Sequence, residues 1–528
     1  MTRDFHAAGR GPALAANAMA ATSHPAATLA ALDILRAGGT AMDAAIAAVA
    51  VLGVVEPQST GIGGDCFCLY APAGSGAVLA FNGSGRAPAA ASIDAYEAAG
   101  ISQFPQTSPH AVTIPGACAA WEALVAAHGR LGLDAVLQPA IRLAEAGVPV
   151  HPRVAFDWAE QADKLRTAGA ESFLPVPAIG DRFAQPALAA TLGAVARHGS
   201  RAFYEGEIAA EMVAVLRARG GWHTEDDFAA GRTAVGSVDP IRARWRGMDV
   251  WQCPPNGSGM VVLMMLGLIG EDAPPSDDPL DPVRIHRHLE AARLAYRDRD
   301  AFLADPSQQA VPVVCLTDPS YLGALRGLIR DDRMLAMPPA GEQPTAHRDT
   351  VCLSVVDRDG NACSLINSLF HPFGSGIVAP RSGVLLQNRG LGFRLQRGHP
   401  NCIAPNKRPL HTIIPGMVTQ DGAAVMSYGV MGGQYQPMGQ TWVLSNRYAY
   451  GLDIQAAIDC PRAFTFGGVC EVERGVPLSA IDRLSRLGHV VRRIASPHGG
   501  GQAIEIDRAR GLLIGGSDPR KDGLALGY

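Results

Sequence analysis

The chain has 528 residues, of which 48% are hydrophobic and 18% are charged, so it must bury a large core and is not a disordered protein. The net charge of −4 and only three lysines exclude the basic surface of a nucleic-acid-binding protein or a polybasic membrane anchor. The N-terminus lacks the apolar core of a signal peptide, and the longest apolar run, 44–55, is too short to span a bilayer. Ten cysteines without CxxC spacing indicate reduced, mostly buried thiols, and we therefore predict a cytoplasmic protein.

The beginning of the chain is predicted to form two helices followed by two strands. Helices are expected over 23–39, where a proline stands in the first turn and two glycines end the pattern, and over 40–56. A glycine loop then enters a strand within 59–70, and 77–88 contains a second strand. The loop lacks a following GK[ST], and Cys66 stands where GxGxxG requires glycine. This loop is therefore not predicted to bind phosphate.

The middle of the chain is predicted to be helical and the last third to contain short strands. Residues 115–230 are mostly helical in pattern, 254–270 form a loop leading into an apolar helix, and 283–306 form a long amphipathic helix. From Thr350 the pattern changes to short strands separated by tight turns. Only the polar, proline-containing stretch 337–349 resembles a linker. This order favours one layered α/β unit.

Several common catalytic signatures are absent from the sequence. It contains no GxSxG, no HExxH, and no serine three residues before any lysine. His286 and His288 would lie about 200° apart on one helix, so they cannot share a metal ion and are interpreted as structural. Cys66 and Cys68 alternate on a predicted strand and are interpreted as small buried hydrophobic residues. No metal or organic cofactor is expected.

Thr350 stands at the start of a predicted strand, directly after the polar stretch 337–349. A threonine at a free N-terminus carries its own base, because its α-amine has an ordinary pKa of about 7.7–8.0. Such a nucleophile would require cleavage of the bond between Asp349 and Thr350, and the cut end would have to move away from it. The alternative is a surface loop before an ordinary hairpin, since apolar residues alternate over 351–355. Taken alone, this stretch favours the loop and hairpin.

Adjacent glycines follow an apolar strand in "GVMGGQYQP", at Gly432 and Gly433. Two glycines in this position can turn two backbone N–H groups toward one point, which is the geometry of an oxyanion hole. Glycine pairs also make ordinary turns, so this signal is weak by itself.

Taken together, these stretches resemble the γ-glutamyltranspeptidase family of N-terminal-nucleophile hydrolases over nearly the whole chain. The likeness is carried in order by "SHPAATLAALDILRAGGTAMDAAIAAVAVLGVVEPQSTGIGGD", "LQPAIRLAEAGVPV", "PPNGSG", "HLEAARLAYRDRDAFLADP", "DTVCLSVVDRDGNACSL", "PNKRPLHTIIP" and "GGSDPRKDGLALGY". The resemblance implies an α/β fold, a four-layer αββα sandwich made as one proenzyme. It also implies autocleavage into a large chain, 1–349, and a small chain, 350–528, which remain together as a heterodimer forming one composite domain.

The resemblance also assigns roles to residues. It implies that Thr350 is the nucleophile, that Gly432 and Gly433 form the oxyanion hole, and that the hydroxyl of Ser368 supports the nucleophile. The implied reaction is attack on an amide carbonyl, formation of an acyl-enzyme on Thr350, and release to water or to an amine.

The residues that hold a γ-glutamyl substrate in this family are the ones that differ here. Ser84 stands where the family has an arginine for the substrate carboxylate, although Arg86 follows two residues later. Gly392 replaces the aspartate that pairs with the substrate ammonium group, and Phe370 replaces an asparagine near the nucleophile. His411-Thr412 takes the place of a serine pair, and the lid segment that follows Gly392 is shorter than in many members.

Without the aspartate, a γ-glutamyl group would lose about 1–3 kcal/mol of binding for each unpaired charged contact. A carboxylate can still be bound by an arginine fork, and the candidate substrate-binding residues are Ser84, Arg86, Arg389, His411 and Thr412, with a structural salt bridge as the alternative role of Arg86. We therefore predict a self-processing threonine amidohydrolase for a small carboxylate-bearing amide such as oxamate, as in the branch with oxamate amidohydrolase and glutathione hydrolase-like proenzymes. The alternatives are a glutathione hydrolase or γ-glutamyltransferase with altered contacts, and a non-catalytic binding relative.

Overall fold

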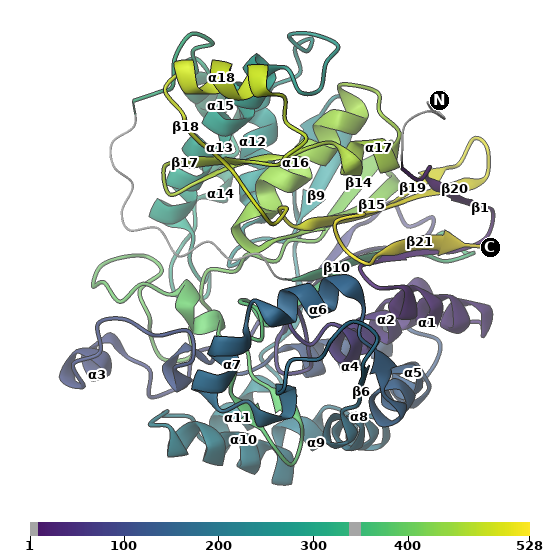
Figure 1. Cartoon of the computed structure of the whole chain (residues 1–528), viewed down its shortest axis with the longest axis vertical. Helices are drawn as coiled ribbons and strands as arrows, with labels where there is room; N and C mark the ends of the chain where they lie inside the picture. The colour runs from purple at the N-terminus through teal and green to yellow at the C-terminus, as the bar shows by residue number, and fades with distance from the viewer. Residues whose placement is uncertain (1–8, 337–349) are drawn as a thin grey trace.

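Two seven-stranded sheets lie face to face in the middle of the molecule, and a layer of helices covers the outer face of each (Figure 1). The structure is a computed structural model that describes residues 9–336 and 350–528. It has the αββα layering that the sequence resemblance implies. The stretch 337–349, with Asp349 of the predicted cleavage site, lies outside the described residues.

The first sheet has the strand order β21-β2-β10-β11-β3-β4-β7, and all of its neighbours pair antiparallel. Its central β10–β11 hairpin turns at Gly360, where φ is 88°, as the sequence predicts. The strands are β2 (Met19–Thr22), β3 (Asp65–Ala71), β4 (Leu79–Gly83), β7 (Gly236–Val238), β10 (Val351–Val356), β11 (Ala362–Ser368) and β21 (Leu524–Gly527).

The second sheet has the order β1-β20-β19-β15-β14-β9-β8 and is also antiparallel throughout. Its strands are β1 (Ala13–Ala15), β8 (Ile241–Trp245), β9 (Met248–Gln252), β14 (Gly416–Gln420), β15 (Ala423–Met431), β19 (Gly500–Asp507) and β20 (Leu512–Ser517). Smaller sheets are formed by β5 (Val148–Pro149) with β6 (Arg182–Phe183), by β12 (Val378–Ala379) with β13 (Val384–Leu385), and by β16 (Ala463–Phe466), β17 (Val469–Val472) and β18 (Val490–Arg493).

Both large sheets contain strands from before and from after residue 350, so neither part of the chain has a sheet of its own. The apolar layer between the sheets also draws on both parts, with Phe67 from the first and Ile366, Met417 and Ile504 from the second. A cut before Thr350 would therefore leave two chains that share one core.

The helices on the first sheet bury their apolar faces against β3, β10 and β11. This layer begins as predicted: His24 caps α1 through its side chain, and Thr40 forms a capping box with Asp43 at the start of α2. Its helices are α1 (Pro25–Arg36), α2 (Ala41–Val55), α3 (Ile93–Ala98), η1 (Pro109–Ala111), α4 (Ala117–His128), α5 (Leu133–Ala146), α6 (Pro152–Ala159), α7 (Ala162–Ala168), η2 (Glu171–Phe173), α8 (Pro186–His198), α9 (Arg201–Tyr204), α10 (Glu207–Ala218) and α11 (Glu225–Gly231). The predicted helical content of 115–230 is confirmed.

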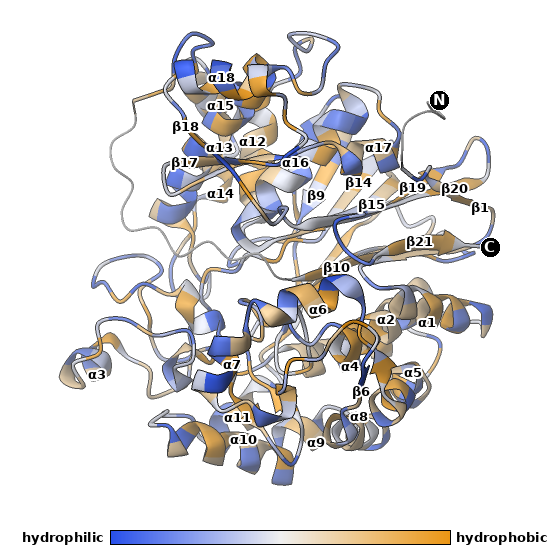
Figure 2. Ribbon diagram, in the orientation of Figure 1, coloured by the Kyte–Doolittle hydropathy of each residue, from blue (hydrophilic) through white to orange (hydrophobic). Residues whose placement is uncertain are grey.

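The helices on the second sheet include the apolar helix and the long helix that the sequence predicts, α12 and α13. Figure 2 shows apolar residues along the strands of both sheets and a mixture of polar and apolar residues on the helices. This layer contains α12 (Gly259–Ile269), α13 (Pro282–Phe302), α14 (Val313–Leu316), α15 (Pro319–Arg326), α16 (Gln436–Tyr448), α17 (Ile454–Asp459) and α18 (Leu478–Arg486), and short turns η3 (Arg389–Gly392) and η4 (Gly433–Tyr435) follow β13 and β15.

The prediction of short strands after Thr350 did not include the helices α16, α17 and α18, of which α16 is the longest. Residues 436–446 of this helix are all buried, so its sequence lacks the alternation of apolar and polar faces by which a surface helix is recognised. Within residues 9–336 and 350–528, no helix is both long enough and apolar enough to cross a membrane.

Candidate active site

Thr350 lies immediately before β10 and is completely buried. The register of the hairpin pairs Val351 with Asn367, which places Thr350 opposite Ser368 at the end of β11. The two hydroxyl oxygens, Thr350 Oγ1 and Ser368 Oγ, are 3.2 Å apart. The structure therefore brings together the predicted nucleophile and the predicted supporting hydroxyl.

Ser368 is linked to a second side chain of the site through Phe370. The Phe370 backbone N–H donates to Ser368 Oγ over 2.9 Å. The aromatic ring of Phe370 faces the guanidinium of Arg389, whose Cζ is 3.9 Å from the ring centroid. A cation over an aromatic face is attracted to it, most strongly when both are removed from water.

Arg389 is a fully buried cation with unused hydrogen-bonding capacity. Its Nη1 donates to Thr412 Oγ1 over 3.0 Å, whereas Nε and Nη2 have no hydrogen-bond partner among the described residues. Burial lowers the pKa of Arg389 to about 9, and the nearby Asp65 opposes this shift. The group therefore remains charged at neutral pH and has two donor nitrogens, Nε and Nη2, free for a ligand.

Asp65 begins β3, where the register places it opposite Ser368. Its Oδ1 accepts from the N–H groups of Gly85 and Gly116 and from Gln387 Nε2, at 2.9, 3.1 and 2.9 Å. Its Oδ2 lies 3.0 Å from His411 Nε2. Both oxygens are therefore engaged by protein groups. Asp65 was not among the residues predicted from the sequence, although a lone carboxylate at the head of an apolar strand is a detectable signal.

His411 is held as a neutral ring. Burial first, and then repulsion by Arg389, lower its pKa to about 4, although Asp65 favours the charged form. The Ile413 N–H donates to Nδ1, so the ring proton is on Nε2 and donates to Asp65. Neither nitrogen is available to a substrate carboxylate in this structure, which leaves the predicted carboxylate-binding role of His411 without support.

Ser84 and Arg86 are also occupied by contacts within the protein. Ser84 is buried, and its hydroxyl donates to Asn82 Oδ1 over 2.6 Å. The Arg86 Nη1 donates to the Asn406 carbonyl over 2.8 Å and lies 3.6 Å from Asp305 Oδ2. The Asp305 contact matches the structural alternative considered for Arg86, and Arg389 is the candidate whose unpaired donors are buried.

Gly392 lies in a position too narrow for a side chain. A Cβ atom built there would be 2.7 Å from the Leu410 carbonyl oxygen, closer than real Cβ atoms approach a backbone oxygen. An aspartate at this position would therefore require a shift of the backbone and not merely a substitution.

Gly432 and Gly433 follow directly after β15, with φ angles of 126° and 56° that side-chain-bearing residues rarely adopt. β10 packs across β19 near this end, since Cys352 Sγ is 3.6 Å from the carbonyl of Gly500, which pairs with Met431. Thr350 lies two residues before Cys352, and the glycine pair follows Met431. The predicted nucleophile and the predicted oxyanion hole thus lie at the same end of the two sheets.

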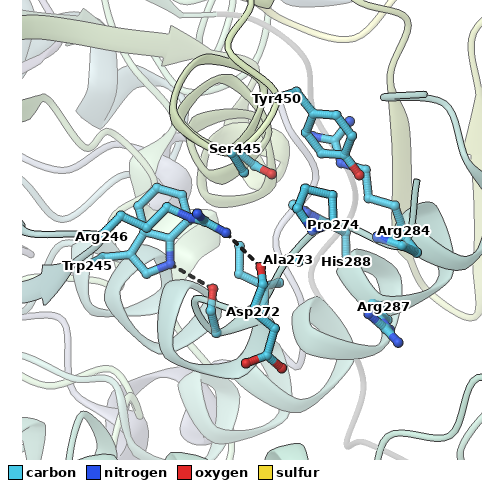
Figure 3. A pocket seen from close by; sticks show the side chains of 14 residues that line it. Trp245, Arg246, Asp272, Ala273, Pro274, Arg284, Arg287, His288, Ser445 and Tyr450 are labelled. Carbon is cyan, nitrogen blue, oxygen red and sulfur yellow. Dashed lines mark hydrogen bonds between the residues drawn. The ribbon is translucent and has the colours of Figure 1, made fainter. Parts of the chain in front are cut away.

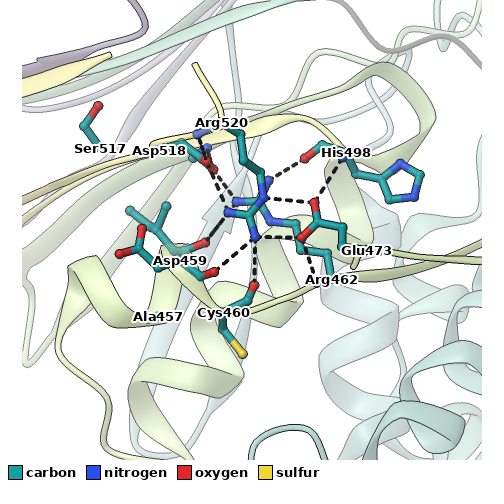
Figure 4. A network of polar contacts seen from close by, with 12 residues as sticks. Ala457, Asp459, Cys460, Arg462, Glu473, His498, Ser517, Asp518 and Arg520 are labelled. Atoms are coloured by element: carbon teal, nitrogen blue, oxygen red, sulfur yellow. Dashed lines mark hydrogen bonds and ion pairs between the residues drawn. The ribbon is translucent and has the colours of Figure 1, made fainter. Parts of the chain in front are cut away.

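Figure 4 shows a network of charged side chains, which contacts the segment after the glycine pair through His498 and Tyr435. Arg462 donates to the carbonyl of His498 and pairs with Asp518, and Arg520 pairs with Asp518 and Glu473. The His498 ring stacks on the ring of Tyr435, with 5.2 Å between the ring centroids. Tyr435 directly follows the sequence Gly432-Gly433-Gln434. Burial alone would raise the pKa of Asp518, but the charges of Arg462 and Arg520 lower this pKa to about 2.

The histidines of α13 have separate environments, as the sequence predicts. His286 Nδ1 is 2.8 Å from His489 Nε2, and His286 Nε2 is 2.7 Å from the Arg330 carbonyl, whereas the His288 ring packs on Trp442 at 5.1 Å. His286, His489 and Glu290 bring potential metal ligands within 4.8 Å of one another. Every one of these ligand atoms already has a hydrogen-bond partner, so hydrogen bonding accounts for the cluster.

A pocket lies in the helical layer of the second sheet (Figure 3). Its cations are bound within the protein: Arg246 donates to the Asp272 carbonyl, Arg284 donates to Asn446 Oδ1, and Arg287 pairs with Asp331. None of the residues that line it belongs to the Thr350 site.

The predicted burial of Cys66 and Cys68 is confirmed.

Stacked antiparallel sheets between two helical layers define the fold of N-terminal-nucleophile hydrolases. A sequence model described as Gamma-glutamyltranspeptidase matches residues 27–528. The glutathione hydrolase-like YwrD proenzyme of Bacillus subtilis (strain 168) is 36% identical, with 96% of this chain and 98% of that protein covered. The oxamate amidohydrolase proenzyme of Klebsiella pneumoniae is 35% identical, with 97% and 98% covered.

A solved structure shows the same relationship. The crystal structure of a cephalosporin acylase from Bacillus halodurans superposes with a TM-score of 0.90 at 36% identity, covering 100% of this chain and 99% of that one. The chain therefore belongs to the γ-glutamyltranspeptidase family. It is an amidohydrolase of that family, and the non-catalytic alternative is set aside.

Proposed function

We propose that the chain cleaves itself between Asp349 and Thr350 and that the freed Thr350 then hydrolyses a small amide carrying a carboxylate. Oxamate, which would give oxalate and ammonia, is the substrate that fits best. The heterodimer of chains 1–349 and 350–528 would be the active form.

The observation that carries this proposal is the buried guanidinium of Arg389, with Nε and Nη2 free of partners among the described residues. A buried charged donor without a partner is costly and calls for one. Two N–H groups of one guanidinium match the two oxygens of a carboxylate. Phe370 and Ser368 connect this cation to Thr350 through contacts of 3.9, 2.9 and 3.2 Å.

The chemistry follows from the groups at the head of β10. The α-amine of Thr350 would take the hydroxyl proton as Oγ1 attacks the amide carbon. The negative charge that develops on the carbonyl oxygen would be met by the N–H groups of Gly432 and Gly433. The C–N bond then breaks, ammonia leaves with the proton, and water hydrolyses the ester on Thr350 to release the dicarboxylate.

A glutathione hydrolase or γ-glutamyltransferase is the second candidate, because a relative named glutathione hydrolase-like is 36% identical. A γ-glutamyl group carries an ammonium group beside its carboxylate. Asp65 has both oxygens engaged, and Gly392 leaves no room for a carboxylate side chain. These features favour the substrate without an ammonium group.

The purified protein tests both parts of the proposal. Intact mass should show two chains divided between Asp349 and Thr350. Ammonia release from oxamate should exceed chromophore release from γ-glutamyl-p-nitroanilide by at least tenfold in kcat/KM. An uncut chain would overturn the nucleophile, and efficient γ-glutamyl release without oxamate turnover would establish the second candidate instead.

A further inference from the structure

We propose that Phe370 is a positioning residue that fixes the orientation of Arg389 and thereby selects a carboxylate without a neighbouring ammonium group; this inference rests on the function proposed above. Phe370 contacts both parts of the site. Its backbone N–H donates to the Ser368 hydroxyl, which contacts Thr350, and its ring packs against the guanidinium of Arg389.

Phe370 has a backbone conformation that the surrounding structure must maintain. Its φ angle is 80°, in the left-handed region that residues with side chains rarely adopt. Lys164 on α7 donates to the carbonyls of Pro372 and Gly374, each over 2.5 Å, and the Phe373 N–H donates to the Gln58 carbonyl over 2.8 Å. Strained residues persist where such contacts over-determine them, and they concentrate at functional sites.

This conformation gives Phe370 two separate effects. An oxygen that accepts the Phe370 N–H can still donate its own hydrogen, so Ser368 Oγ remains able to donate to Thr350 Oγ1. The ring holds Arg389 through the central carbon of the guanidinium at 3.9 Å and takes none of its N–H groups. Arg389 is therefore fixed in place while two donors stay open.

The same arrangement discriminates between substrates by charge. A carboxylate placed against the open donors of Arg389 is attracted, whereas an ammonium group on the adjacent carbon would lie beside a buried cation. The Phe370 side chain has no negative charge to pair with that group, and the Asp65 oxygens are already bonded to Gly85, Gly116, Gln387 and His411. We therefore infer a substrate class of amides bearing a carboxylate and no α-amine.

The test compares two leucine substitutions in the same turn. Phe370→Leu removes the ring from Arg389, and Phe373→Leu is the matched control, because Phe373 is also buried with a positive φ of 55° but packs on Trp158 and Phe173. We expect Phe370→Leu to raise the KM for oxamate and the Kd for oxalate at least tenfold, an effect at least tenfold larger than the change in kcat. Phe373→Leu should lower Tm without this change in Kd.

A double-mutant cycle establishes whether Phe370 acts through the arginine. In an Arg389→Met background, Phe370→Leu should cause no further loss of oxalate affinity by calorimetry. Equal losses for the two leucine variants, or additive losses in the cycle, would overturn the inference. Phe370→Met, which fills more of the space, replaces Phe370→Leu if that variant does not accumulate as two chains.

Oxalate binding also separates this inference from the proposed function. If the wild type binds oxalate through Arg389 and Phe370 but leaves oxamate intact, oxamate is the wrong substrate and the coupling stands. If the wild type binds neither compound, the inference is overturned.

Discussion

Two of the sites with buried arginines in the described part of the chain differ in how completely the guanidinium groups are hydrogen-bonded. The guanidinium groups of Arg462 and Arg520 donate to the carboxylates of Asp518 and Glu473 and to neighbouring backbone carbonyls (Figure 4). Around Arg389, two of the guanidinium nitrogens have no partner among the described residues. Nearby carboxylates compensate the buried charges of Arg462 and Arg520, whereas the carboxylate site proposed above rests on the unpaired nitrogens of Arg389.

The largest effect is expected at Thr350, beside the incompletely paired cluster. Thr350→Ala removes the nucleophile, so we expect no cleavage into two chains and a loss of hydrolysis of at least about 10³-fold. Thr350→Ser keeps a hydroxyl and should retain cleavage and measurable turnover. Intact mass and ammonia release provide the readouts. Normal processing of Thr350→Ala would show that another group makes the cut.

Replacing Arg462 and Arg389 in turn with methionine tests whether the two arginines have different roles. Arg462→Met leaves the buried Asp518 carboxylate with one cation fewer and should destabilise the fold by about 3–5 kcal/mol. Arg389→Met removes a buried cation with unused donors, so stability to urea should be unchanged or higher, while the KM for oxamate rises about 10- to 100-fold. Equal destabilisation by the two substitutions would show that Arg389 is a structural residue like Arg462.

Gly392→Asp tests whether specificity depends on one missing carboxylate. Because a Cβ atom would lie 2.7 Å from the Leu410 carbonyl oxygen, we expect a loss of about 1–3 kcal/mol in unfolding free energy. We expect no gain in γ-glutamyl hydrolysis. Gly392→Ala is the control and should show most of the loss in stability. A gain of γ-glutamyl activity in Gly392→Asp alone would show that the backbone can accommodate the side chain.

The smallest expected effect is a dependence of substrate binding on pH. Burial lowers the pKa of Arg389 to about 9, so its charge is present below this pH and is lost as the pH rises through it. The KM for oxamate should therefore increase up to about tenfold per pH unit above pH 9. Arg389→Lys, measured over the same range, identifies the titrating group. An unchanged KM from pH 7 to 10.5 would contradict the predicted contact.

Histidine burial predicts a separate loss of stability in acid. The pKa values of His24 and His371 are lowered to about 3, and those of His223, His411 and His489 to about 4, chiefly by burial. Below pH 6.5 the unfolded chain binds protons that the folded chain does not, so each histidine removes about 1.4 kcal/mol of stability per pH unit down to its folded pKa. Urea unfolding at pH 7, 6 and 5 measures this slope.

The sequence predicted the parts of the site that short stretches encode. The hairpin after Thr350 follows from alternating apolar residues and a turn at Gly360, and the glycine pair follows an apolar strand. It did not predict α16, because a helix buried on all sides has no polar face. The sequence also could not show which arginine, Arg86 or Arg389, is the better candidate for the substrate carboxylate. Both stand beside a glycine, and they differ only in the partners that the fold supplies.

By itself, the sequence determined the family, the position of the threonine and the order of elements up to the β10–β11 hairpin, because these depend on periodicity, turn residues and motifs along the chain. Only the tertiary structure decided which charges meet. Asp65 and His411 are 346 residues apart and lie within 3.0 Å, and their contact neutralises one candidate for the substrate carboxylate. Burial then leaves Arg389 charged and partly unpaired, a state that depends on the desolvation and neighbours of the folded chain and not on its own identity.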